Sequence, residues 1–432
     1  MDYNDFISNA LKNYEAMPYE ANELYKRQGI GFDLAPYEKA LSSGAGSNES
    51  LKGFAEAASS KLKTKFDAVI GDGKVIYCSV PGLTLSSTES VYDTISKCSM
   101  YRSSEDKFVA FANAFAKDAV LLRIGQSQKT ALNILFVYGA TVPPLQLYAR
   151  VEAGAHAVLN EVFASKDGNI MSGIMQEITL GANSSTEVNV LHVENGGTKS
   201  FGMLKASAEE NSALVVNNLY SGSGMSRHRG GLLSKGRGAQ VDFNDIILGA
   251  EEQKFDLYTE IINEGPESRC SAETKAVALD KSAVIVKGMA KVIHGSRKSI
   301  SYLKEKGILY DKGTQIKMMP DMSIDESDVK ATHSSSVAPI DEDSLFYLGA
   351  RGLAHDDAKR VIVDGFVLGS ISKIGDTHAR VLATAMAIGK LRDRVIGLRE
   401  IEARDAWADT NESPQQSAFA GSYKYQYRGD LK

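Results

Sequence analysis

Between about residues 120 and 335, apolar side chains stand at every second position along short segments. Clear examples are Thr186–Val193, Ala213–Leu219, Gln240–Leu248 and Ala283–Ile293. Successive side chains of a β-strand point to opposite faces, so this alternation is what a strand with one buried face requires. The 3.6-residue period of an amphipathic helix is almost absent here. The pattern therefore predicts a long region of short strands.

Pairs of small residues precede these segments and indicate how the strands are connected. The pairs are Gly154-Ala155, Gly181-Ala182, Ser212-Ala213, Gly238-Ala239 and Ser282-Ala283, and steps of 27, 31 and 26 residues separate the first four. Such a recurring step is typical of stacked coils that turn on a small residue. A sandwich or barrel would show tight hairpin turns about every 8–12 residues, and these are scarce. The sequence thus predicts a mainly β fold, a right-handed parallel β-helix (β-solenoid).

Helical patterns precede this region. Residues 1–104 are predicted to form a mostly helical N-terminal domain, which begins with an apolar stripe that includes Phe6 and Leu11. A second helix is expected at about residues 20–28, and the Ser/Gly-rich run Ser42–Ser50 is expected to be a loop. Asp72-Gly73 tolerates positive φ and predicts a hairpin over Val69–Tyr77.

Helical patterns also follow the predicted β region. Asp341 is a predicted N-cap, and the acids Glu342 and Asp343 after it complement the helix dipole. Gly352 is expected to end this first helix, and further helices are predicted at about 355–371 and 377–407. The predicted domains are therefore 1–104, a β-helix core at 105–338, a C-terminal helical domain at 339–410 and a flexible tail at 411–432.

Composition and charge narrow the class of protein. The 432 residues are 43% hydrophobic and 24% charged, with a formal net charge of −5. This is ordinary globular composition, and the acidic balance argues against a nucleic-acid or anionic-membrane binder. The N-terminus has no basic segment followed by an apolar run, and no apolar stretch is long enough to span a membrane. We expect a cytoplasmic protein.

The cysteines and one basic run are candidate chemical sites. Three distant cysteines without a C-x-x-C pair predict neither a disulfide framework nor a self-contained metal site. Cys270 has Arg269 beside it, which could lower the pKa of its thiol, so it is either a reactive thiol or an ordinary coil residue. The Gly-rich run 221–238 lacks the phosphate-loop motif and is expected to be a solvated corner loop. Its basic residues, among them Arg227 and Arg229, could contact an acidic partner.

One stretch of the last third carries a recognisable motif. Asp328-Val329-Lys330-Ala331-Thr332-His333 is followed by Asp341-Glu342-Asp343-Ser344-Leu345-Phe346-Tyr347-Leu348, then by Arg351-Gly352 and Gly365-Phe366. Order and spacing resemble the signature of the SufB/SufD family of iron–sulfur cluster assembly proteins. Upstream, Val151–Ala155 and the Gly265-Pro266 turn are similar to coils of that family. The resemblance covers about residues 105–370.

The resemblance implies a non-catalytic scaffold subunit. Family members work in a complex of SufB, SufD and the ATPase SufC, so the implied partners are a SufC-type ATPase and a SufB-like paralogue or a second copy of this chain. The residues implied to bind partners belong to the C-terminal helices: Asp341, Leu345, Phe346, Tyr347, Arg351, Gly365 and Phe366. His333 is implied as a ligand of iron or of a transient cluster at the partner interface, and its alternative role is to hydrogen-bond backbone at a strand end. No tightly bound cofactor is expected, and flavin binding stays open.

Departures from the family pattern favour the SufD side. Asn263 stands where many members have a histidine, Thr314-Gln315-Ile316 replaces the strand that carries a cysteine in SufB, and Ser334 replaces a glutamate. A SufB-like homodimer remains an alternative. From a different class, a β-helix carbohydrate-active enzyme would need clustered carboxylates and usually an export signal, whereas the acids here are dispersed. A purely structural interaction protein is the third alternative.

Overall fold

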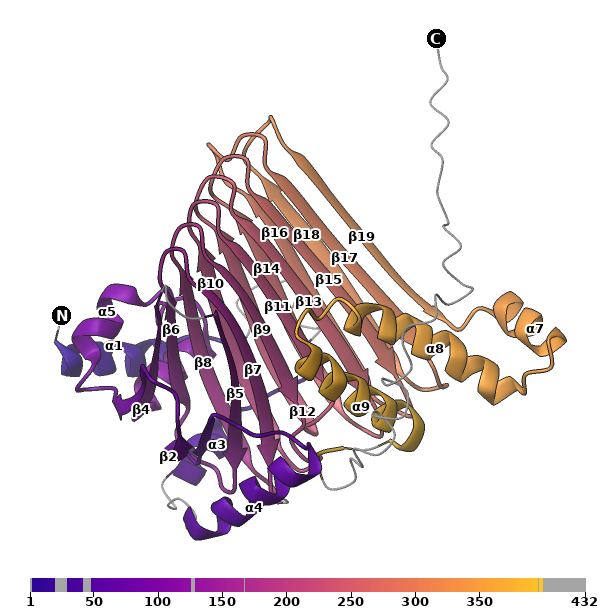
Figure 1. Cartoon of the computed structure of the whole chain (residues 1–432), viewed down its shortest axis with the longest axis horizontal. Helices are drawn as coiled ribbons and strands as arrows, with labels where there is room; N and C mark the ends of the chain where they lie inside the picture. The colour runs from indigo at the N-terminus through magenta and orange to yellow at the C-terminus, as the bar shows by residue number, and fades with distance from the viewer. Residues whose placement is uncertain are drawn as a thin grey trace.

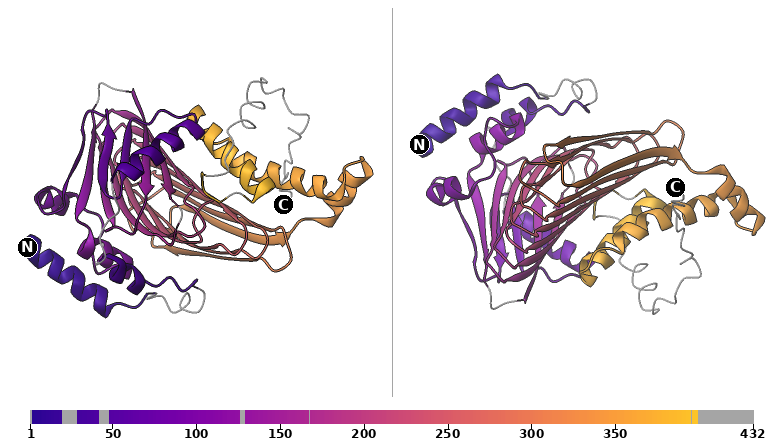
Figure 2. Two further views of the ribbon diagram at one scale, coloured as in Figure 1. Left: turned by 90° about the horizontal axis from the view of Figure 1, so that it is seen from below. Right: turned by 90° about the horizontal axis from the view of Figure 1, so that it is seen from above.

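The structure is a computed structural model that describes residues 2–19, 29–41, 48–125, 129–166, 168–394 and 396–398. Two long β-sheets face each other and helices lie on their outer sides (Figure 1, Figure 2). The helix predicted at residues 20–28 and the tail at 411–432 lie outside the described residues. Most of the loop predicted at Ser42–Ser50 also lies outside them, and its last residues begin a helix.

The strands alternate between the two sheets along the chain. Sheet A has the spatial order β19-β17-β15-β13-β11-β9-β7-β5-β1-β2, and sheet B has the order β18-β16-β14-β12-β10-β8-β6-β4-β3. Sheet A comprises β1 (Ala68–Gly71), β2 (Lys74–Cys78), β5 (Lys129–Tyr138), β7 (His156–Ser165), β9 (Ser185–His192), β11 (Ala213–Tyr220), β13 (Gln240–Gly249), β15 (Arg269–Ala278), β17 (Ile300–Leu309) and β19 (Lys330–Pro339). Sheet B comprises β3 (Leu83–Ser87), β4 (Asp118–Ile124), β6 (Leu145–Val151), β8 (Met171–Leu180), β10 (Lys199–Ala208), β12 (Met225–Ser234), β14 (Lys254–Asn263), β16 (Ala283–Val292) and β18 (Gln315–Ile324). Apart from β2 and β3, which pair antiparallel, each strand runs parallel to its sheet neighbours.

This arrangement confirms the predicted parallel β-solenoid. Each coil contributes one strand to each sheet, and pairing links strands two apart in the chain. The first four small-residue pairs precede β7, β9, β11 and β13, which all belong to sheet A, so their steps measure one coil each. Ser282-Ala283 precedes β16 of sheet B and belongs to the other corner. The hairpin predicted around Asp72-Gly73 is also confirmed, with φ of 47° and 74° at these residues.

The solenoid interior is filled by side chains that stack from coil to coil. Phe136, Phe163, His192 and Tyr220 are in register on successive strands of sheet A, with ring centroids 4.6, 5.0 and 4.9 Å apart. These distances match the spacing of about 4.8 Å between neighbouring strands. Because parallel strands pair in register, side chains at the same inward position of successive coils stack into a continuous column.

Helices cover the outer faces of both sheets (Figure 2). The helices are α1 (Tyr3–Ala16), α3 (Ala35–Leu41), α4 (Asn48–Lys61), α5 (Tyr92–Cys98), α6 (Lys107–Phe115), α7 (Glu342–Ala350), α8 (His355–Ile371) and α9 (Thr377–Asp393). α1, α3 and α6 pack on sheet B around Tyr37, Phe108 and Phe201. α4, α8 and α9 pack on sheet A, where Leu135 and Val363 share one hydrophobic cluster. The flanking helices were predicted, but the N-terminal part also adds β1–β3 to the sheets.

A ladder of asparagines runs along the outer face of sheet A, and one of its members is hydrogen-bonded to the N-cap of α9. Asn133, Asn160, Asn189, Asn217 and Asn244 are in register, and each side-chain amide donates to the preceding one at 2.8–3.0 Å. Asn160 also donates to Asp376 at 3.1 Å, and Asp376 caps α9 by accepting from the Ala379 N–H at 2.8 Å. The ladder thus helps to fix the start of α9 on the solenoid. α9 ends at Asp393, where Arg394 adopts a left-handed conformation (φ 58°), so the predicted helix to 407 is interrupted here, and residues 399–407 of that prediction lie outside the described residues.

A buried lysine attaches the last turns of α9 to a solenoid corner. Lys390 is 0% exposed, and its Nζ donates to the Ser221 carbonyl at 2.9 Å and to Oε1 of Gln253 at 2.5 Å. Burial lowers the pKa of this ammonium to about 7, although Glu251 and Asp280 oppose the shift. Burial of Lys390 therefore favours the neutral amine more than solvent does for an exposed lysine.

The predicted corner loop at 221–238 is wrong for most of its length. Met225–Ser234 forms β12, an inner strand of sheet B that pairs with β10 and β14. Gly230 points inward, where an added Cβ would lie 2.5 Å from the ring of Phe243. Arg227 and Arg229 point outward toward Asp106 of the N-terminal part. Tertiary contacts therefore explain both the glycine and the arginines that suggested a loop.

Candidate functional site

The solenoid ends at its last coil in two strands with a free edge. β18 pairs with β16 and β19 pairs with β17, and neither has a second sheet neighbour among the described residues. The two sheets draw together here, and β18 contacts β19. β19 is exposed along almost its whole length, with Ile324 of β18 at 46% and Val337 of β19 at 36% exposure. Unpaired backbone groups beside apolar side chains make this edge suited to pairing with another chain.

His333 lies on this last coil. It is in register with Leu303, which is 2% exposed in the solenoid core, so His333 continues an inward-facing column. Because no further strand lies beside β19 in the ranges that the structure describes, the His333 side chain is exposed instead of buried. An imidazole in this position is accessible to a partner that extends the sheet.

A buried carboxylate, which the sequence analysis did not single out, lies on β17, the strand next to the one that carries His333. Glu305 is in register with Ser335, two residues after His333, and is 1% exposed. Burial raises the pKa of Glu305 to about 8, and the nearby Ser335 opposes this shift only in part. The signal in the sequence was an acid at an inward position of the alternating segment 300–309. Within the described ranges, no three His, Cys, Asp or Glu side chains converge on a common point.

The residues predicted to bind a partner separate into two groups. Asp341 is the N-cap of α7 and accepts from the Ser344 N–H at 2.9 Å, and Leu345 is buried at 6% exposure. Phe366 packs toward the solenoid, where the Lys275 Nζ donates to its carbonyl at 2.7 Å and lies 4.8 Å from its ring centroid. These three residues build and anchor the helical pair α7–α8.

The other predicted residues face outward. Phe346 is 80% exposed and Tyr347 is 53% exposed, with the Arg351 guanidinium 5.2 Å from the Tyr347 ring centroid. On α8, Val361 is 50% exposed, and an added Cβ at Gly365 would meet nothing within 4 Å. We call Phe346, Tyr347, Val361 and Gly365 the α7–α8 surface. Large exposed apolar side chains gathered on one helical pair are typical of an interaction site.

The connection between α8 and α9 is held to sheet A by charged groups. Glu187 of β9 accepts from the backbone N–H groups of Gly375 at 2.9 Å and Asp376 at 3.1 Å. Lys373 forms an ion pair with Glu273, which also pairs with Lys304 at 2.9 Å. Burial opposes ionisation of Glu273, but these two lysines outweigh it and lower its pKa to about 2. α9 therefore sits on a fixed support, while α7 extends beyond the last coil (Figure 1).

Cys270 is located inside the solenoid. It is 0% exposed, and its thiol donates to the Ser234 hydroxyl at 3.2 Å. Burial raises the pKa of this thiol to about 12, so it stays protonated. These properties favour the ordinary coil residue over the reactive thiol.

No helix in the described part of the chain combines the length and apolar character needed to cross a membrane. That observation agrees with the sequence, which has no long apolar stretch.

Comparison with known proteins gives a consistent result. The family profile described as SUF system FeS cluster assembly, SufBD core domain matches residues 144–366, more than half of the chain. An iron–sulfur cluster assembly SufBD family protein of Pyrococcus horikoshii is 23% identical over 274 residues, which cover 62% of this chain and 61% of that protein. The iron–sulfur cluster assembly protein SufD of Bacillus subtilis is 22% identical over 279 residues, covering 62% and 63%. SufD of Escherichia coli is 24% identical over 216 residues, covering 49% and 51%.

The chain spans less than two thirds of the length of these relatives. The profile begins within the solenoid and ends on α8, at the Gly365-Phe366 pair that closes the motif found in the sequence. The parallel β-solenoid, the order of the motif and the profile match agree, and the chain belongs to the SufB/SufD family of iron–sulfur cluster assembly proteins.

Proposed function

We propose that this protein is a SufD-like scaffold subunit that joins a SufB-like partner through its last coil and a SufC-type ATPase through its C-terminal helices. The observation that carries the proposal is the free, partly apolar edge of β18 and β19, with His333 exposed on it. The similarity to SufD proteins of two bacteria supports the SufD-like assignment.

Pairing through the last coil follows from the physics of sheet edges. A strand added to β19 would satisfy its free backbone groups and cover Val337. The partner can be a SufB-like paralogue or, as the alternative, a second copy of this chain in a two-fold arrangement. Light scattering with and without the paralogue distinguishes these two assemblies.

Docking of the ATPase is proposed for the α7–α8 surface. Phe346 and Tyr347 offer aromatic side chains of the kind that dominate binding energy at interfaces. Asp341, Leu345 and Phe366 support this surface from behind, and Arg351 orients Tyr347 at its edge. The chain carries no phosphate-loop motif, so in this proposal nucleotide hydrolysis belongs to the partner and the chain itself is not an enzyme.

His333 is proposed to bind iron or a nascent cluster, which is the cargo of the complex. An exposed imidazole at a chain interface can offer a nitrogen lone pair to iron. Because no group of three His, Cys, Asp or Glu side chains that could hold a metal ion occurs in the described part of this chain, the partner would supply further ligands. Glu305 lies on the neighbouring strand β17, one inward position along from His333, and would add a proton-binding group beside the cargo.

The proposal is tested by charging the sheet edge. Val337→Lys on β19 should abolish co-purification with a co-expressed SufB-like paralogue, because a lysine on an edge strand opposes strand addition. Val75→Lys is the matched control, since Val75 is 39% exposed on β2, the edge strand at the other end of the same sheet. Normal pairing by Val337→Lys, or equal loss in both variants, would refute the assigned interface.

A further inference from the structure

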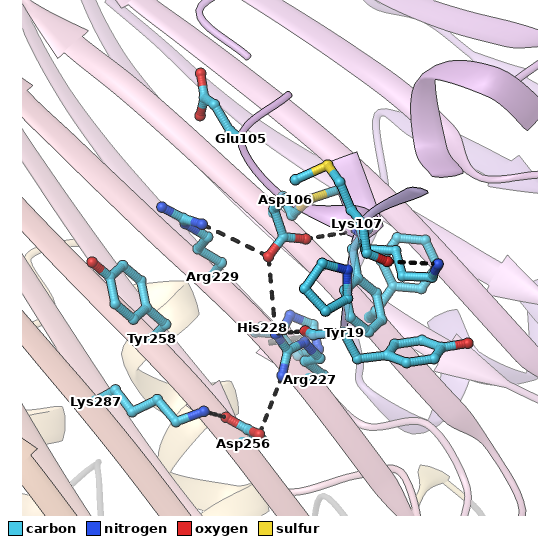
Figure 3. Close-up of a pocket in the computed structure, with 16 residues that line it drawn as sticks. Tyr19, Glu105, Asp106, Lys107, Arg227, His228, Arg229, Asp256, Tyr258 and Lys287 are labelled. Carbon is cyan, nitrogen blue, oxygen red and sulfur yellow. Dashed lines mark hydrogen bonds and ion pairs between the residues drawn. The ribbon is translucent and has the colours of Figure 1, made fainter. Parts of the chain in front are cut away.

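A pocket of about 180 Å³ opens on the outer face of sheet B, away from the last coil and the α7–α8 surface. Its floor is formed by outward-facing residues of β10, β12, β14 and β16. Its wall is formed by two N-terminal segments, Met17–Tyr19 and Glu105–Phe108 (Figure 3). The pocket is smaller than the roughly 300 Å³ or more of sites for drug-sized ligands, so its size suits a small charged group.

A network of seven ion-paired side chains surrounds the pocket and carries an excess of positive charge. The members are Asp106, Arg227, Arg229, Asp256, Glu260, Lys287 and Lys291. Four of them are basic and three are acidic. Lys107 and Glu105 line the same pocket with opposite charges, so they leave this excess unchanged, and the Lys107 Nζ donates to the Met17 carbonyl at 2.9 Å. This local excess occurs in a chain whose formal net charge is −5.

The most buried members of the network neutralise one another. Lys287 has only 1% of its side chain exposed and lies 3.0 Å from Asp256, which is 2% exposed. The Arg227 guanidinium approaches the other oxygen of Asp256 at 3.3 Å. One carboxylate, Asp256, therefore pairs with two cations, so this part of the pocket carries a net positive charge.

Arg229 holds its guanidinium at the pocket without close partners. Its nitrogens are 3.8 Å from Oδ2 of Asp106 and 3.9 Å from Oε2 of Glu260, beyond the 2.7–3.2 Å of an N–H···O hydrogen bond. No hydrogen bond of this guanidinium is found among the described residues. The guanidinium lies over the Tyr258 ring at 4.7 Å, and that of Arg227 lies over the Phe108 ring at 4.5 Å. Stacking fixes the plane of the Arg229 guanidinium while leaving its N–H edges available, whereas the Arg227 guanidinium donates to Asp256 and to the Tyr19 carbonyl, both at 3.3 Å.

We propose that this pocket binds a phosphate-type oxyanion, either free phosphate or the phosphate group of a small metabolite. The fork of Arg229 would donate two parallel N–H bonds to adjacent oxygens, as arginine does with phosphate. Arg227, which is already paired with Asp256, would add positive charge near the anion, and the surplus positive charge would offset the second negative charge of the ligand. The site is independent of the proposed scaffold function and of His333.

Calorimetric titration of the full chain with inorganic phosphate and with glycerol 3-phosphate, in chloride buffer of matched ionic strength, tests the proposal. Saturable binding of inorganic phosphate identifies the free anion as sufficient, and binding of glycerol 3-phosphate alone identifies a phosphate ester. We expect Arg229→Gln to weaken binding by about tenfold or more, because the fork is lost. Absence of saturable binding of both ligands at millimolar concentration overturns the proposal.

Two further variants keep the test decisive. Arg229→Lys retains the charge and should bind with intermediate affinity, which also covers the case in which Arg229→Gln melts early. Arg237→Gln is the control, because Arg237 is 61% exposed and pairs with Glu267 at a solenoid corner outside the pocket. Equal affinity of wild type and both Arg229 variants, or equal weakening by Arg237→Gln, contradicts the assigned site.

Discussion

We expect Phe346→Ala on the α7–α8 surface to weaken binding of the SufC-type ATPase without lowering the stability of the fold. Because Phe346 is 80% exposed in the isolated chain, its truncation should change the free energy of unfolding by no more than about 0.5 kcal/mol. If the ATPase covers this ring, burial contributes about 1.5–3 kcal/mol to binding. Loss of that contribution corresponds to a rise of about 10- to 100-fold in the dissociation constant.

Leu345→Ala is the matched control on the neighbouring residue. Leu345 is 6% exposed and packs in the cluster between the C-terminal helices and sheet A. Its truncation should lower the stability of this helical region by about 2–5 kcal/mol through a cavity. The two variants are therefore expected to have opposite profiles, with Phe346→Ala stable and weakly binding and Leu345→Ala thermally labile.

The assay combines titration calorimetry against a purified SufC-type ATPase with thermal melts followed by circular dichroism. Both are carried out on the full chain at one pH and ionic strength, so that electrostatic differences do not enter. An unchanged dissociation constant for Phe346→Ala, at an unchanged melting temperature, would refute the α7–α8 surface as the ATPase site. A large loss of stability in Phe346→Ala would instead show that the ring is buried in the isolated chain.

Three further predictions concern other residues. His333→Gln should leave assembly and melting unchanged but lower iron and acid-labile sulfide in the co-expressed complex, and unchanged cluster content would make His333 structural. The pKa of Lys390 is lowered from 10.5 to about 7 on folding, so between these values the unfolded state binds more protons and stability should rise with pH. Relative to Lys390→Met, the wild type should gain up to about 1.4 kcal/mol per pH unit between pH 7 and 10 in urea unfolding, and a pH-independent difference would contradict this. In native protein at pH 8, iodoacetamide followed by peptide mapping should modify exposed Cys78 and spare buried Cys270, and equal labelling would contradict the assigned burial.

Much of the fold could be predicted from the sequence, because its determinants are local and repetitive. Alternation of apolar residues at Thr186–Val193 and Gln240–Leu248 matches strands β9 and β13 within a few residues. The steps between the first four corner pairs agree with the coil lengths of 29, 28 and 27 residues in the strand register to within three residues, since each coil must return the chain to the same edge. Asp341 was recognised as an N-cap because the reason for a cap lies within four residues of it.

Predictions failed where a residue is explained by a distant contact. β12 resembled a loop because it belongs to a Gly-rich run and glycine is depleted in strands, yet the ring of Phe243 requires Gly230 and Asp106 faces Arg229. Cys270 has an arginine beside it in sequence, but burial between stacked coils decides the pKa of its thiol. The end of α9 also escaped prediction, because no strong stop signal marks Arg394.

The sequence by itself determined the β-solenoid, the flanking helices and the family motif, because periodicity, capping and motif spacing are properties of neighbouring residues. Only the tertiary structure decided which motif residues face outward. Leu345 and Phe346 are adjacent apolar residues on α7, and packing in the hydrophobic cluster shared by the C-terminal helices and sheet A buries the first and leaves the second exposed. His333 is accessible because its inward-facing column ends with β19, which has no further strand beside it in the described part of the chain. Burial is set by what packs against a residue, and that information is spread over the whole chain.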